Sequence, residues 1–235
     1  MRMMIARFAL AMAAVTLTTA ACTPHPLVTN QHCYDPQQQL DEARQALEAA
    51  RAAGCREQGV PGGVSCSAAV RDIERLATIC PGHGPTLMAN AVVAYDDGYP
   101  AKAQQFLDQL LDRSGAQPDA AVLRARIAIE EGNVPFARKF VEQQILLSPD
   151  HAGLREVQGA ALYLSGRIEE ARQALDMAQQ LGAPAWRIAY HLGLIEESQG
   201  HFDEAAAKYT LALQGNPQWL AAQARLNAIR ARRQQ

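Results

Sequence analysis

Apolar side chains recur three and four positions apart along most of the chain. Ile168, Ala171 and Leu175 form one such stripe, and Ala205 and Tyr209 belong to another. This spacing places the apolar side chains on one face of an α-helix. No run of β-branched residues alternates with polar residues anywhere in the sequence. The pattern therefore predicts an all-α protein.

A fixed period accompanies these stripes. Four glycines stand 34 residues apart, and each is followed five residues later by an alanine: Gly98, Gly132, Gly166 and Gly200, then Ala103, Ala137, Ala171 and Ala205. Glycine suits the end of a helix, because a left-handed backbone costs little without a Cβ. Alanine one turn into the next helix lets two helices pack closely. A period of this length is typical of a protein built from repeated helical hairpins.

The remaining repeat positions resemble the tetratricopeptide family. The last copy matches the family pattern at Leu192, Gly193, Gly200, Ala205, Tyr209, Ala212 and Pro217. Glu196 departs from the pattern, since the family usually has tyrosine there. The resemblance covers about residues 84–217 in four copies and implies an α-solenoid of four helix pairs. An amphipathic helix in residues 218–235, with Leu220 and Ala224 on one face, is expected to cap the last pair.

Residues 1–21 have the features of a bacterial signal peptide. Arg2 and Arg7 precede an apolar stretch that is too short for a permanent membrane span. The sequence Thr19-Ala-Ala-Cys22 then resembles a lipobox, although Thr19 replaces the usual aliphatic residue. The resemblance implies cleavage before Cys22 and lipidation of that cysteine, with residues 22–35 as the tether. An ordinary signal peptide cut near Ala21 is the alternative.

The residue after Cys22 bears on the membrane that would hold the anchor. It is Thr23, not the aspartate that resembles an inner-membrane retention signal. We therefore expect a protein on the periplasmic face of the outer membrane.

Four further cysteines bracket two amphipathic segments within residues 36–83. The segments run from about Pro36 to Ala53 and from Cys66 to Ile79. In an antiparallel hairpin the end of the first helix meets the start of the second, so a nested pairing is expected, Cys33–Cys80 and Cys55–Cys66. In the loop-entropy model such bridges contribute about 4 and about 3 kcal/mol when counted separately. They would stabilise a hairpin that has a neighbour on one side only.

A zinc site is the alternative use of these cysteines. His32-Cys33 and the segment from Cys80 to His83 offer ligands, but their spacing matches no common zinc module. An oxidising compartment favours disulfides. The segment Pro81–Pro85 is interpreted as a turn into the first repeat.

Catalysis is not expected. No nucleophile-elbow, phosphate-loop or paired-histidine motif occurs in the sequence, and no metal or cofactor is implied. Without Arg2 and Arg7, 20 basic residues remain against 24 acidic ones. This balance argues against nucleic acid as a partner.

Binding of a protein is the expected function. In the tetratricopeptide family the first helix of each repeat lines a concave groove. The family register assigns mostly apolar and aromatic residues to the groove, namely Met88, Val92, Tyr95, Val122, Arg126, Ile129, Glu156, Ala160, Tyr163, Tyr190, Leu194 and Glu197. Such a groove suits a protein or peptide partner with an apolar or aromatic contact segment. Each of these side chains could alternatively pack against the neighbouring repeat.

Three classes of function remain open at this stage. The first is an outer-membrane adaptor in envelope assembly, similar in plan to the tetratricopeptide lipoproteins, pilotins among them, that serve type IV and Flp pili. The second is a periplasmic holdase chaperone for unfolded envelope proteins. The third is a metal-dependent enzyme built on the cysteine hairpin. Fold alone does not decide among them.

Overall fold

The computed structural model describes residues 33–55, 66–113 and 115–232. Within these ranges it contains eleven α-helices and no strand. They are α1 (Pro36–Ala52), α2 (Cys66–Ile79), α3 (Gly84–Asp96), α4 (Pro100–Leu111), α5 (Pro118–Glu130), α6 (Val134–Leu147), α7 (Ala152–Leu164), α8 (Ile168–Gln180), α9 (Ala185–Ser198), α10 (Phe202–Gly215) and α11 (Leu220–Arg232). The predicted signal peptide, Cys22 and most of the tether lie outside the described residues. Among the described helices, none is both long enough and apolar enough to cross a membrane.

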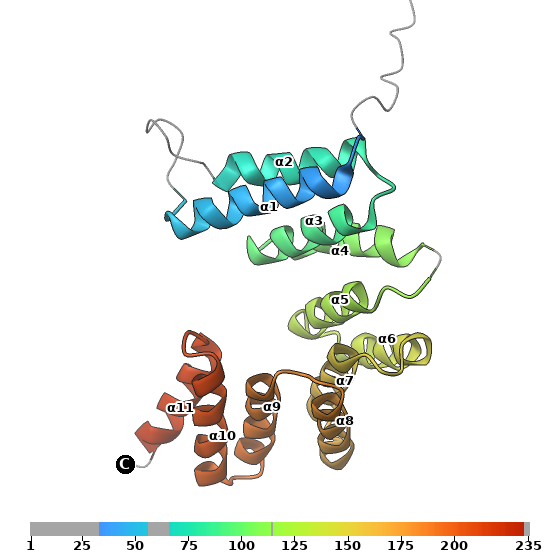
Figure 1. Ribbon diagram of the computed structural model, residues 1–235. Coiled ribbons are helices and arrows are strands. Elements are labelled where there is room, and N and C mark those ends of the chain that lie inside the picture. Colours follow the sequence, from blue (N-terminus) through green and yellow to red (C-terminus); the bar gives the residue numbers. More distant parts are fainter. Residues whose placement is uncertain (1–32, 56–65, 114, 233–235) are drawn as a thin grey trace, which may run out of the picture. The chain divides into compact units, whose positions relative to one another are not determined.

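The helices pack in consecutive antiparallel pairs, α3 with α4, α5 with α6, α7 with α8 and α9 with α10 (Figure 1). The second helix of each pair also contacts the first helix of the next pair, and α11 packs against α10. This is the predicted all-α solenoid of four tetratricopeptide pairs, and the prediction of the fold is confirmed. The α1–α2 hairpin packs in the same manner, because α2 contacts both α1 and α3.

The periodic glycines end helices, as their spacing predicts. Gly98, Gly132, Gly166 and Gly200 have φ between 76° and 83°. At the end of α3 the amide of Gly98 donates to the carbonyl of Tyr95 at 3.0 Å, and that of Tyr99 donates to Ala94 at 2.8 Å. These bonds satisfy carbonyls that the helix leaves without partners. A residue with a Cβ would be strained at this backbone angle.

Small residues allow the close contacts inside each pair. The four periodic alanines, Ala103, Ala137, Ala171 and Ala205, have no exposed surface. Gly159 lies against Leu175, since an added Cβ would stand 2.7 Å from its Cγ. At such contacts the backbones of paired helices approach more closely than larger side chains permit.

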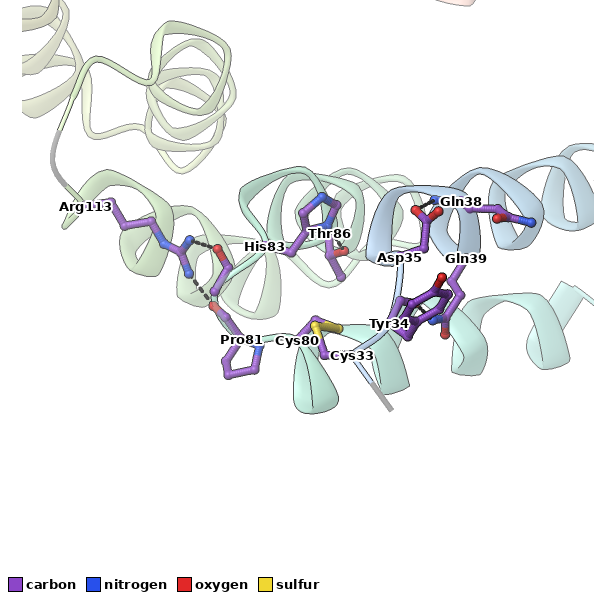
Figure 2. The surroundings of a disulfide bond; sticks show 11 residues. Cys33, Tyr34, Asp35, Gln38, Gln39, Cys80, Pro81, His83, Thr86 and Arg113 are labelled. Atoms are coloured by element: carbon purple, nitrogen blue, oxygen red, sulfur yellow. Dashed lines mark hydrogen bonds between the residues drawn. A yellow bond between two sulfur atoms is a disulfide. The ribbon is translucent and has the colours of Figure 1, made fainter. Parts of the chain in front are cut away.

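Two disulfides hold the α1–α2 hairpin, and they are the nested pair expected from the sequence. Cys33 and Cys80 have Cα atoms 5.3 Å apart, and Cys55 and Cys66 have Cα atoms 5.1 Å apart. Figure 2 shows the first bridge between the start of α1 and the end of α2. All four sulfurs that a zinc site would use are therefore committed to bridges.

Polar contacts dock the hairpin onto the first repeat. Buried Asn90 of α3 donates to the carbonyl of Ile73 in α2 at 2.9 Å. Arg113 at the end of α4 donates to the carbonyls of Pro81 and Gly82 (Figure 2). Pro81, Gly82 and His83 thus form the predicted connection into the first repeat, whereas Gly84 and Pro85, which the prediction included in the turn, already belong to α3.

Candidate protein-binding groove

Side chains from the first helix of each pair line three adjoining hollows, which together we call the groove. The N-terminal hollow, of about 290 Å³, lies between α1 and α3, with Leu47, Ile73, Met88, Val92 and Val93 among its lining residues. The central hollow, of about 540 Å³, is lined from α3, α5 and α7 and includes Val92, Tyr95, Val122, Arg126 and Glu156. The C-terminal hollow, of about 390 Å³, is lined from α5, α7 and α9 and by Trp219.

Adjoining hollows share residues, so the groove is continuous. The N-terminal and central hollows share Met88 and Val92. The central and C-terminal hollows share Tyr95, Arg126, Glu156 and Arg187. A segment of a partner could therefore pass from one hollow into the next.

Most of the residues assigned to the groove from the sequence line these hollows. They are Met88, Val92, Tyr95, Val122, Arg126, Ile129, Glu156 and Ala160. Val92 is apolar and 38% exposed, so it presents hydrophobic surface to solvent. The inner helices of the first three repeats thus place all their predicted residues except Tyr163 along these hollows.

The structure gives the other four predicted residues packing roles. Tyr163 packs against the core that α8 and α9 share. Tyr190 and Leu194 pack against the core formed by α10 and α11. Glu197 accepts a hydrogen bond from the Tyr209 hydroxyl at 2.6 Å and pairs with Arg225 of α11 at 3.3 Å. Here the capping helix covers the inner face that the family register assigns to the groove.

Tyr95 marks the junction of the central and C-terminal hollows. Its hydroxyl donates to the carboxylate of Glu130 at 2.5 Å. Burial and this hydrogen bond raise the pKa of Tyr95 to about 12. The phenol is therefore protonated at physiological pH and donates its hydrogen bond to Glu130.

An ionic cluster lies at the same junction. The Oε1 atom of Glu156 lies 2.7 Å from Nη2 of Arg187, 3.2 Å from Nε2 of His191 and 3.5 Å from Nη2 of Arg126. Arg187 also donates from Nε to this oxygen at 2.9 Å. The Glu156 side chain is only 4% exposed. We call these four residues the Glu156 cluster.

The cluster departs from the chemistry of the other repeats. One period earlier and two periods earlier, the positions equivalent to Glu156 are Val122 and Met88, and one period later it is Tyr190. A buried ion pair stabilises a fold little better than apolar residues of the same size, because desolvation offsets the attraction. The cluster therefore adds little stability over apolar packing of the same size, and it places charged side chains in the groove.

An aromatic wall closes the C-terminal hollow. The rings of Trp186 and Trp219 meet edge to face with centroids 4.9 Å apart, and Tyr190 lies 4.3 Å from Trp219. The Arg187 guanidinium lies 5.8 Å from the Trp186 ring centroid. Trp186 also packs against Gly215, because a Cβ added to Gly215 would stand 2.5 Å from the Cβ of Trp186. Trp186 therefore both packs and lines the groove.

Sequence reasoning missed Arg187, His191 and Trp219. Arg187 stands one helical turn before Tyr190, so it shares a helix face with a residue that the register did assign. Trp219 follows Trp186 by 33 residues, which is nearly one period. Extending the register by one turn at each inner helix would have found Arg187, but neither His191 nor Trp219 lies on that register.

The stapled hairpin also contributes to the groove, which the sequence did not predict. Leu47 of α1 lines the N-terminal hollow beside Arg44 and Arg51. Arg51 pairs with Asp96 at 3.4 Å and with Asp97 at 3.5 Å, and so holds α1 to the end of α3. The hairpin thus adds an inner helix in front of the four repeats.

Comparison with known proteins bears on the fold alone. No family model matches the sequence, and neither does any curated protein sequence. Among solved structures, a thermophilic tetratricopeptide protein of Thermus thermophilus is similar with a TM-score of 0.64. It is 20% identical, over 83% of this chain and 98% of that chain. A tetratricopeptide repeat protein of Parabacteroides merdae gives a TM-score of 0.64 at 16% identity, covering 84% of this chain and 72% of its own.

A third solved structure is that of pilF from Pseudomonas aeruginosa. Its TM-score is 0.57 at 16% identity, over 80% of this chain and 82% of that chain. Together with the helix pairs and their period, these similarities show that the chain has the tetratricopeptide fold.

Proposed function

We propose that this protein is a scaffold, not an enzyme, and that it binds a segment of a partner protein in the groove. The observation that carries the proposal is the continuous groove, lined from the inner helices of successive pairs. It combines exposed apolar surface at Val92 with an aromatic wall and a buried ionic cluster. Aromatic and arginine side chains in such settings are the usual energetic centres of protein interfaces.

A selective adaptor fits the groove better than a holdase. A holdase must accept many unfolded segments, and flexible apolar surfaces serve that purpose. Here the Glu156 cluster holds Arg187 through two donors, at 2.7 and 2.9 Å, so charged groups are fixed in place before a partner arrives. Fixed charges discriminate among segments and so favour one partner.

Photo-crosslinking in cells would separate these two functions. A photoreactive amino acid at Val92 should yield one dominant crosslinked partner for an adaptor and a broad smear for a holdase. The matched control is the same amino acid at Lys139, which is exposed on α6 and lines none of the hollows described above. No crosslink above the Lys139 level would contradict binding in the groove.

The cellular setting that we propose is the periplasmic face of the outer membrane, through lipidation of Cys22. The support is the resemblance of residues 19–22 to a lipobox, together with two disulfides that suit an oxidising compartment. Cys22→Ser should release the protein from membranes into the soluble periplasmic fraction. Sedimentation of the variant with the outer membrane would contradict the anchor.

A role in pilus or secretion machinery is the finer part of the proposal. Its support is the plan of the chain, which resembles the tetratricopeptide lipoproteins that serve type IV and Flp pili. The similarity to the pilF structure supports that plan at the level of the fold. Identification of the Val92 crosslink by mass spectrometry tests this role directly, since a partner outside such machines would contradict it.

A further inference from the structure

We propose that the groove recognises an internal acidic residue of the partner, flanked on both sides by apolar residues. The proposal rests on the proposed function and adds the chemistry of the bound segment. The Glu156 cluster receives the acidic side chain, and the hollows on either side receive the apolar ones.

The accessible side of the Glu156 cluster consists of donors. The Glu156 side chain is 4% exposed, whereas those of Arg126, Arg187 and His191 are 32%, 25% and 18% exposed. A partner entering the groove therefore meets two guanidinium groups and an imidazole, with the one carboxylate beneath them. An approaching carboxylate is the complementary group.

The arginines can hold a second carboxylate without giving up Glu156. All three neighbours approach the same oxygen, and Arg126 is the most distant of them at 3.5 Å. A guanidinium has five N–H donors in a planar fork, so Arg126 keeps donors for a ligand. Glu156 acts as a positioning residue that orients these donors.

Two acidic residues that line the hollows beside the cluster already have partners. Asp119 lies 3.1 Å from Nε2 of His151, and Glu130 accepts the hydrogen bond from Tyr95. Asp119 lines the central hollow and Glu130 the C-terminal hollow, and their carboxylates would repel further acids placed beside the cluster. One acidic residue between apolar ones therefore fits the groove better than an acidic run.

The position of the cluster favours an internal residue over a chain end. Arg126, Glu156 and Arg187 line both the central and the C-terminal hollow. A segment bound at the cluster can continue toward Val92 on one side and toward Trp219 on the other. A terminal carboxylate would leave one of these apolar surfaces uncovered.

The test is selection of peptides from two displayed libraries on the purified full-length protein. In one library random 12-residue peptides are fused at their C-terminal end, so that every carboxylate is a side chain. In the other library the peptides end in a free carboxylate. We expect the fused library to yield peptides with Asp or Glu at one fixed position and apolar residues on both sides of it.

Variants connect the selected peptides to the cluster. Arg126→Glu should weaken binding of a selected peptide about tenfold or more and should shift the preference at the fixed position toward Lys or Arg. Arg126→Gln should weaken binding without that shift, and it tests the idea again if the charge reversal disturbs folding. Arg71→Glu is the matched control, because Arg71 is exposed on α2 and lines none of the hollows described above.

Each other outcome has a definite meaning. Apolar peptides without a fixed acid would overturn this inference and leave the groove as a binding site. Enrichment in the free-end library alone would also overturn it, in favour of a terminal carboxylate. Selected peptides whose binding survives every groove substitution, or no selected peptide at all, would contradict both this inference and the proposed function.

Discussion

The phenol ring of Tyr209 packs directly on the backbone of α9 at Gly193. A Cβ added at Gly193 would stand 2.7 Å from Cε1 of the ring. Tyr209 is fully buried, and its hydroxyl is held by Glu197 at 2.6 Å, so the ring has no room to move. Burial and this hydrogen bond raise the pKa of Tyr209, which keeps the phenol protonated as the donor. The contact sets how closely α9 and α10 approach.

Substitution of this glycine should destabilise the last repeat. Gly193→Ala gains about 1 kcal/mol of helix propensity but overpacks the contact, which typically costs about 1–3 kcal/mol. We expect a net loss, measured as a lower melting temperature by circular dichroism. Gly82→Ala is the control, since a Cβ there meets no atom within 4 Å. Equal stability of the two variants would show that the Tyr209 ring can shift to make room for the added Cβ.

Ala171 offers a test of the stacking itself. It is fully buried in α8, and its carbonyl lies 3.3 Å from the point where a Cβ on Gly159 would stand. Ala171→Arg should cost about 3 kcal/mol or more, because it both overpacks the contact and buries a charge. Loss of helical signal should extend over neighbouring repeats, since each stabilises the next. Ala207→Arg, at an exposed site on α10, should melt like the wild type.

Reduction of the disulfides should loosen α1 and α2 before the repeats. The two bridges close separations of 47 and 11 residues, and each contributes about 3–4 kcal/mol in the loop-entropy model when counted alone. Hydrogen exchange followed by peptide should therefore rise first in residues 36–79 when reductant is added. A variant with Cys55→Ser and Cys66→Ser keeps the Cys33–Cys80 bridge and should show part of this change without reductant. Equal protection of the hairpin in the reduced protein would contradict this expectation.

Glu196 should give the fold a measurable acid sensitivity. Burial alone would raise its pKa, but hydrogen bonds from His201 and Arg172, both at 3.0 Å, outweigh burial and lower the pKa below its usual value. The carboxylate therefore stabilises the folded state above its unfolded pKa, and this contribution is lost as the pH falls through the folded pKa. Melting temperatures of wild type and Glu196→Gln should differ at pH 7 and converge in acid. For exposed Glu204→Gln the difference from wild type should stay near zero throughout.

The period of the sequence predicted the helix pairs, and the antiparallel arrangement of two amphipathic segments predicted the disulfides. Both predictions depend on contacts between elements that are near in sequence. Gly98 ends a helix with a positive φ, and Ala103 lies fully buried between two helices. Every copy of the repeat needs a residue of each kind. The family register also placed Val92 and Arg126 in the groove, because the inner helices repeat with the same spacing. The register could not show which side chains the capping helix covers. Tyr190 is one of them.

The Glu156 cluster needed the structure for a different reason. Glu156 lies 30 to 35 residues from each of the other three members, and the four belong to three helices, so no local pattern joins Glu156 to its partners. Glu196 is similar, since it replaces the family's tyrosine and pairs with Arg172 of the preceding helix. Ion pairs between repeats depend on the lateral position of two helix faces, which period alone does not fix.

Because Glu156 on α7 binds Arg126 of α5 and both Arg187 and His191 of α9, one carboxylate ties three consecutive inner helices together. In a solenoid whose units touch only their nearest neighbours, this carboxylate is one of the contacts that set the spacing of neighbouring units. A bound partner that attracts Arg126 changes the distance between Arg126 and Glu156. We therefore expect the elastic stiffness of the middle of the molecule to differ between its empty and loaded forms, a difference that force spectroscopy on single molecules can measure.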